Sequence, residues 1–157
     1  MPEETTKKPR VDLRSDFPHG KDDGDLHIRV NPSLLTADFT SPFRASYTDE
    51  ALETTTTITS GDSTGTIVAS PFHTGKLTNV FPQPFLLALK EELKTLTWHH
   101  RSNDLYKFNQ TDDLALNALP HIKALRDYMA GEEFVGFMEK ITGLELTRGY
   151  LDLAAQR

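Results

Sequence analysis

Histidine and carboxylate side chains are the groups in this sequence that could hold a metal. The 157-residue chain has no cysteine and six histidines: His19, His27, His73, His99, His100 and His121. A mononuclear non-haem iron site uses two histidines and one carboxylate. On a strand, two of these ligands stand two residues apart, because alternate side chains share a face. No histidine is followed by an acid at that spacing, and only Asp25 precedes one, in reverse order. The residues alone therefore indicate no iron site.

The remaining polar groupings have structural explanations. The neighbours His99 and His100 stand just after an expected helix, where histidines interact with the terminal carbonyls. The pairs Asp112–Asp113 and Glu132–Glu133 suit a turn and the first turn of a helix. The sequence has no serine-nucleophile elbow, phosphate loop or dinucleotide glycine motif. No catalytic centre follows from these residues.

Composition limits the classes of partner. The chain has 17 Lys and Arg against 23 Asp and Glu, a formal charge of −6, which argues against direct nucleic-acid binding. No apolar run approaches the ~20 residues of a membrane-spanning helix, so we expect no membrane partner. The polar first ten residues are not a secretory signal. Within them, Lys7–Arg10 is either a weak nuclear signal or a solvated charge cluster.

The sequence divides near residue 70. Residues 1–70 are expected to be a mostly disordered or low-complexity extension, because residues 1–25 are charged and rich in Gly and Pro. Within this extension, the alternation over residues 26–30 predicts a short edge strand. The Thr, Ser and Gly residues of 54–70 predict a linker.

Residues 71–157 have the pattern of a folded unit with an α+β fold. A short strand is expected between residues 72 and 80, and an amphipathic helix over 84–96. Aromatic residues predict a strand over 104–109. Two helical pieces follow over 120–141, and a last strand is expected over 150–157. Each helix is apolar on one side and must pack against something, so we expect more sheet than the chain supplies.

The strand over 104–109 has two possible roles. It places Asp104, Tyr106 and Phe108 on one face, and Leu105 and Lys107 on the other. Such a strand either buries one aromatic face within a sheet or forms the wall of a groove that binds an extended peptide.

The same stretch carries a family resemblance. Residues 103–108, Asn-Asp-Leu-Tyr-Lys-Phe, and 110–114, Gln-Thr-Asp-Asp-Leu, closely resemble a signature of the ribosomal prolyl hydroxylases, of the termination-and-polyadenylation type. The resemblance covers residues 71–157. Supporting matches in the same order are Pro71–His73, Pro120–Ile122, Leu125–Arg126 and Thr142–Leu146.

The resemblance implies a fold and cofactors. The family's catalytic domain is a double-stranded β-helix, or jelly roll, so the helices at 84–96 and 120–141 would be its buttress and 150–157 its first barrel strand. The family uses Fe(II), 2-oxoglutarate and ascorbate. Its iron-binding His-x-Asp pair, distant His, and 2-oxoglutarate-binding Arg and Tyr would all fall beyond Arg157. We therefore expect a truncated, amino-terminal fragment with no catalytic or metal residues, which binds none of these cofactors.

The resemblance also implies a function. The complete enzyme would be a dioxygenase that hydroxylates a proline of a ribosomal small-subunit protein in the cytoplasm and nucleus, with links to translation termination and oxygen sensing. By likeness, Asp104, Tyr106 and Phe108 would touch the proline-bearing peptide, and Ala154 and Gln156 would face the cofactor cavity. The alternatives are a truncated, non-catalytic binding module and a small α+β interaction domain unrelated to the oxygenases.

Overall fold

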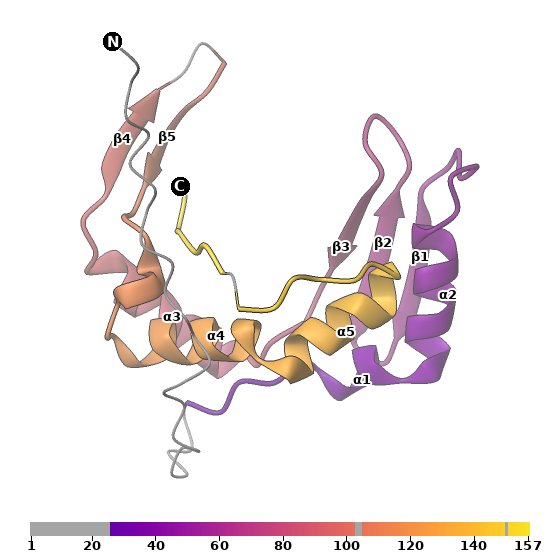
Figure 1. Ribbon diagram of the computed structural model, residues 1–157, viewed down its shortest axis with the longest axis horizontal. Coiled ribbons are helices and arrows are strands. Elements are labelled where there is room, and N and C mark those ends of the chain that lie inside the picture. Colours follow the sequence, from indigo (N-terminus) through magenta and orange to yellow (C-terminus); the bar gives the residue numbers. More distant parts are fainter. Residues whose placement is uncertain (1–25, 103–104, 150) are drawn as a thin grey trace.

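The computed structural model describes residues 26–102, 105–149 and 151–157. The fold is mixed α+β, with helices along the base of a U and a sheet rising at each end (Figure 1). In chain order, the elements are α1 (Pro32–Leu35), α2 (Ala37–Tyr47), β1 (Thr56–Ser60), β2 (Ser63–Val68), β3 (Thr74–Leu77), α3 (Gln83–Lys94), β4 (His99–Ser102), β5 (Lys107–Gln110), the 3-10 helix η1 (Leu114–Leu116), α4 (Pro120–Ala130) and α5 (Glu132–Thr142). Among these helices, none has the length and apolar character needed to cross a membrane.

A three-stranded antiparallel sheet forms one arm of the U. Its strand order is β1-β2-β3, and a two-residue turn at Gly61–Asp62 joins the first two strands. Gly61 has a φ of +58°, which such hairpin turns require. Alternate residues of β2 are buried, and Gly65 on that face lies directly under the rings of Phe39 and Phe43 from α2. The sheet and α2 therefore form one layered unit.

Residues 26–70 differ from the expected extension. The predicted linker over 54–70 contains β1 and β2, because threonine has a high strand propensity and Gly61–Asp62 closes a tight hairpin. Residues 26–30, expected as an edge strand, form no strand, although Ile28 and Val30 are buried. The expectation of disorder for residues 1–25 lies outside the described residues.

The predicted helices of the second half are confirmed. The helix expected over 84–96 is α3, and the two pieces expected over 120–141 are α4 and α5, separated at Gly131. Gly143 ends α5 in the left-handed region, with a φ of +74°, as the Thr142–Gly143 stop predicted.

Two hydrophobic clusters fill the molecule and share aromatic residues. The sheet cluster consists of Val30, Leu34, Phe39, Phe43, Ile67, Phe137 and Ile141. The helix cluster consists of Ile28, Phe85, Leu89, Leu114 and Ile122. Phe81 and Tyr128 pack against both clusters, with their ring centroids 6.1 Å apart in an edge-on arrangement.

The one-sided helices find their cover within the chain. Helix α5 packs on α2, so residues from the first half shield Phe137 and Ile141, and α3 packs on α4. We expected a shortage of sheet because residues 26–70 were not expected to fold. The packing of α2 from this region on α5 was therefore not foreseen. Leu86 and Leu87 of α3 stay 42% and 55% exposed. The strands seen here form a three-stranded and a two-stranded sheet, and the jelly roll stays a prediction.

Candidate functional site: the β4–β5 hairpin

The β4–β5 hairpin is the second arm of the U (Figure 1). Its strands pair antiparallel, with His99 opposite Gln110 and Arg101 opposite Phe108. The strand predicted over 104–109 is thus β5, shifted toward the C-terminus. Near the tip, Leu105 is 81% and Tyr106 66% exposed. The hairpin therefore presents a large aromatic side chain to solvent.

The C-terminal residues lie along β5. The backbones of Asn109 and Arg157 exchange two hydrogen bonds of 2.9 Å, and Thr111 N–H donates to the Ala155 carbonyl at 3.0 Å. A single β-bridge joins Gln110 and Gln156. The strand predicted over 150–157 is thus an extended segment with one bridge, and its first residue lies outside the described residues. The hairpin and this segment form a narrow, three-segment platform.

Aromatic and charged contacts fix the base of the platform. Trp98 donates from Nε1 to the Leu93 carbonyl of α3 at 3.3 Å, and the Arg157 guanidinium lies 4.4 Å from the centroid of the Trp98 ring. His99 Nε2 is 3.2 Å from an Asp112 carboxylate oxygen on the solvent-exposed side. The interpretation of His99 as a helix-end cap was wrong, because α3 ends at Lys94 and His99 begins β4.

The described residues that were predicted to bind substrate and cofactor lie on neighbouring segments, but in different surroundings. Asp104 lies outside the described residues. Tyr106 precedes β5, and Phe108 is half-buried within it. Ala154 borders a cavity of about 110 Å³, whereas Gln156 is exposed and does not line that cavity. Their roles toward a peptide or a cofactor stay predictions.

The cofactors of the resembling family do not fit the residues seen here. The cavity beside Ala154 is lined by Leu, Ile and Ala side chains alone, which offer no partner for the two carboxylates of 2-oxoglutarate. In the described ranges, no three His, Asp or Glu side chains lie close enough to hold a metal. His121 Nε2 is buried and has no hydrogen-bond partner among the described residues. The carboxylate next to this histidine is Glu92, which contacts the other ring nitrogen, Nδ1. We therefore assign no oxidative step to these residues.

Glu92 makes a largely buried contact that the sequence analysis missed. Its carboxylate, 13% exposed, accepts hydrogen bonds from the backbone N–H groups of His121 and Ile122, each at 2.9 Å, and lies 2.7 Å from His121 Nδ1. Burial alone would raise the pKa of Glu92, but the bonds from His121 and Ile122 hold it below its ordinary value. The signal was available: Glu92 follows Leu89 by three residues, on the buried face of α3.

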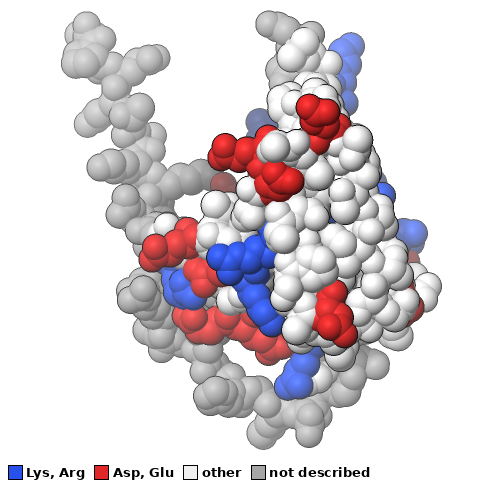
Figure 2. Space-filling model, turned by 90° about the vertical axis from the view of Figure 1, so that its right-hand side faces the viewer, with Lys and Arg blue, Asp and Glu red and all other residues white. Residues whose placement is uncertain are grey.

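The opposite end of the molecule shows mixed charge. On the face that carries α2 and the three-stranded sheet, acidic and basic side chains are interspersed over a largely uncharged surface (Figure 2). Across the described part of this face, no basic stripe gathers that would follow a phosphate backbone.

Comparison with known proteins shows that part of the chain is similar to prolyl 3-hydroxylases. No family model matches the chain. A stretch of 64 residues, 41% of the chain, is homologous to prolyl 3-hydroxylases. It is 47% identical to Prolyl 3-hydroxylase OGFOD1 of Mus musculus and 45% identical to Prolyl 3-hydroxylase OGFOD1 of Xenopus laevis. The match spans 12% of the length of each relative. The family resemblance is thereby confirmed for part of the chain.

Proposed function

We propose that this chain contributes the peptide-facing hairpin of an Fe(II)- and 2-oxoglutarate-dependent prolyl hydroxylase that acts on a ribosomal small-subunit protein in the cytoplasm and nucleus. The 47% identity over 64 residues to a prolyl 3-hydroxylase carries this proposal. The residues described here would recognise the peptide. The groups that carry out the oxidation would be other residues of the enzyme. Its links to translation termination and oxygen sensing rest on the same family relation.

The hairpin has the features that suit an extended peptide. Tyr106 stands largely exposed near its tip, and Phe108 is half-buried opposite Arg101. An exposed aromatic ring offers a large, rigid contact area at low entropic cost, and proline rings pack well on aromatic faces in grooves that bind extended chains. The Trp98–Arg157 contact and the C-terminal segment hold the base of the hairpin.

Tyr106→Ala is expected to weaken peptide binding to the 157-residue chain by about ten-fold, since aromatic side chains that become buried in a complex are common hot spots of binding. The probe is a fluorescein-labelled, proline-centred peptide of the small-subunit protein, titrated by fluorescence anisotropy without iron. Phe72→Ala is the matched control, because Phe72 is also an exposed aromatic residue, at 77%, but lies just before β3. Equal affinities for all three proteins would contradict the assignment of the hairpin.

The chain is expected to release no succinate above background when mixed with Fe(II), 2-oxoglutarate, ascorbate and the same peptide. The physical reason lies in the sequence, which contains no His-x-Asp or His-x-Glu pair, the local signature of the iron site. Succinate is measured by mass spectrometry, with a boiled sample as the blank. Measurable, peptide-dependent turnover would show that other residues hold the iron.

A non-catalytic binding module is the second candidate. The observation that favours it is the cover of α5 by α2, which gives the described residues a buried interior of their own. Cooperative thermal unfolding together with iron-independent peptide binding supports a binding role for the chain by itself. A non-cooperative transition with loss of near-ultraviolet dichroism counts against it.

A further inference from the structure

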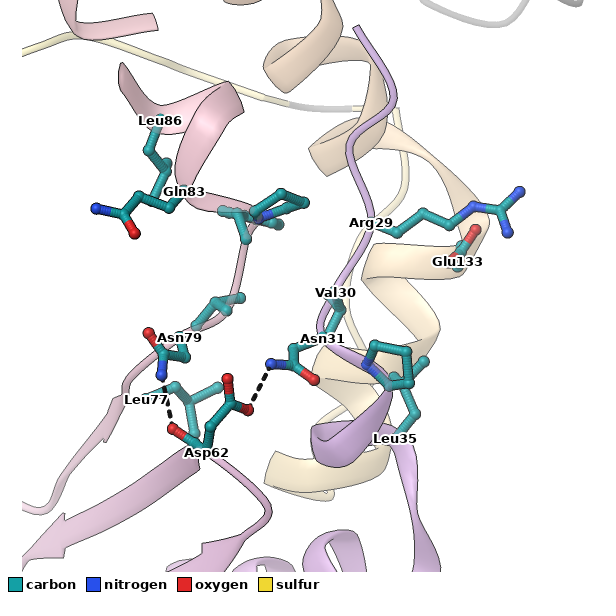
Figure 3. A pocket seen from close by; sticks show the side chains of 14 residues that line it. Arg29, Val30, Asn31, Leu35, Asp62, Leu77, Asn79, Gln83, Leu86 and Glu133 are labelled. Atoms are coloured by element: carbon teal, nitrogen blue, oxygen red, sulfur yellow. Dashed lines mark hydrogen bonds between the residues drawn. The ribbon is translucent and has the colours of Figure 1, made fainter. Parts of the chain in front are cut away.

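A groove of about 980 Å³ lies between two extended segments of the chain (Figure 3). One wall is formed by residues 29–32 and Leu35 of α1, and the other by Leu77, residues 79–83 and Leu86 of α3. The Asn31 N–H donates to the Val80 carbonyl at 2.8 Å and joins the two walls. The groove is therefore a built feature with a hydrogen-bonded connection between its sides.

A polar network fixes an acidic group at one end of the groove. Asn31 Nδ2 donates to Asp62 Oδ1 at 3.1 Å, and Asn79 Nδ2 donates to the Asp62 carbonyl at 2.6 Å. Figure 3 shows the Asp62 side chain between the two walls, with both amides turned toward this residue. Asp62 Oδ2 has no hydrogen-bond partner among the described residues. This oxygen is held in place and can accept a hydrogen bond from a ligand.

The middle of the groove is apolar and partly exposed. Leu35 and Leu86 stand on opposite walls and are 38% and 42% exposed. Burying such side chains against a ligand is favourable, at roughly 25 cal/mol per Å² of apolar surface. An aliphatic side chain of a ligand is therefore expected to sit between them.

The β-sheet beside the groove has an open edge. β3 is an outer strand of the sheet. The hydrogen bond from Thr78 N–H to the Thr64 carbonyl shows which residues of β3 direct their backbone groups toward β2. Leu77, opposite Gly65, therefore falls at a position whose N–H and C=O groups point away from β2. Because Leu77 also borders the groove, an extended peptide can pair with this edge.

We propose that this groove binds an extended, basic peptide segment of a partner protein. A lysine or arginine side chain pairs with Asp62, and an aliphatic side chain on the other face of the segment contacts Leu35 and Leu86. Charge complementarity supports a basic ligand: the groove is lined by two carboxylates, Asp62 and Glu133, and one guanidinium, Arg29, which leaves one negative charge in excess. This site is separate from the hairpin and does not depend on its role.

The test uses the 157-residue chain and two blocked, fluorescein-labelled peptides, Gly-Lys-Val-Leu-Val-Lys-Gly and its counterpart with Glu in place of Lys. Fluorescence anisotropy is expected to show binding of the basic peptide and at least about ten-fold weaker binding of the acidic one, because two charges are reversed. Asp62→Asn should weaken the basic complex about three-fold, as for a solvent-exposed ion pair. Leu86→Ala should weaken it about five-fold through lost apolar contact.

Matched controls separate the groove from general surface effects. Glu145→Gln removes an exposed carboxylate, and Leu144→Ala removes a leucine that is 55% exposed, both outside the groove. These two variants should bind the basic peptide as the unmodified chain does. Equal loss in the controls, or equal binding of the two peptides, overturns the proposal. The proposal is also overturned if the free chain forms a dimer that Leu86→Ala dissociates, because the groove is then occupied by a second copy of the chain.

Discussion

Gly65→Ala is expected to lower the free energy of unfolding by about 2–3 kcal/mol, the range for overpacking a dense core. A Cβ atom at this position would lie 2.6 Å from ring carbons of Phe43 and 2.7 Å from the Phe39 ring. Both rings are almost fully buried, so neither can move aside without disturbing the sheet cluster. Urea titration followed by far-ultraviolet dichroism measures the change.

Gly136→Ala is the matched control for this substitution. Gly136 lies inside α5, and nothing lies within 4 Å of an added Cβ. Alanine is the better helix former, so this variant should be more stable by roughly 0.5–1 kcal/mol. If both variants shift the urea midpoint equally and in the same direction, the close approach of α2 to β2 is not the cause.

Glu92→Ala is expected to cost about 2–3 kcal/mol, since hydrogen bonds to a charged group are lost and N–H donors at the start of α4 are left unpaired. Glu92 joins α3 to α4 by accepting from His121 and Ile122. The helix cluster lies under this contact. Thermal melts at pH 7 should show the loss, whereas Glu91→Ala, on the exposed side of α3, should change the midpoint little.

The pH dependence of stability tests the same contact. The pKa of Glu92 in the folded chain is lowered from its ordinary value of 4.5. The folded state therefore holds the proton less tightly than the unfolded state, and this stability is fully present above about pH 4.5. It is lost as the pH falls through the folded-state pKa. Glu92→Gln should flatten this part of the stability curve, and an unchanged acid limb would show that Glu92 does not contribute to it.

Local patterns predicted the second half of the fold well. Helices α3, α4 and α5 follow from regular apolar spacing, with a proline at the start of two of them and Gly143 at the end of the third. In each case the signal lies within the element itself. The hairpin strand β5 was also predicted, but its partner β4 was not, since the four exposed residues of β4 carry no apolar alternation.

The first half was missed because its stability is not local. The threonine-rich stretch of β1 resembles linker composition, and only pairing with β2 gives it a regular structure. The short-range signal of the Gly61–Asp62 turn was outweighed by composition. Helix α2 contains Pro42, which masks its helical pattern, yet Phe39 and Phe43 bury it against the sheet. Contacts between residues far apart in the sequence decide these elements.

The candidate sites likewise differ in whether a local sequence pattern or only the fold reveals them. Tyr106 and Phe108 were proposed from a short motif that resembles prolyl hydroxylases, and their role stays a prediction. The groove between the extended walls had no such signal, because Asn31, Asp62 and Asn79 are far apart in the sequence and meet only in the fold. Glu92 and His121, 29 residues apart, likewise become partners only when α3 and α4 pack.

Tyr128 links parts of the molecule that would otherwise respond separately to stress. Its hydroxyl accepts a hydrogen bond from the Val30 N–H at 2.9 Å and donates to Glu133 at 3.2 Å, while its ring contacts both hydrophobic clusters. Phe81, whose ring packs edge-on against Tyr128, also contacts both clusters, so the two residues together connect the ends of the U. The two hydrophobic clusters are therefore expected to melt together, in a single cooperative transition.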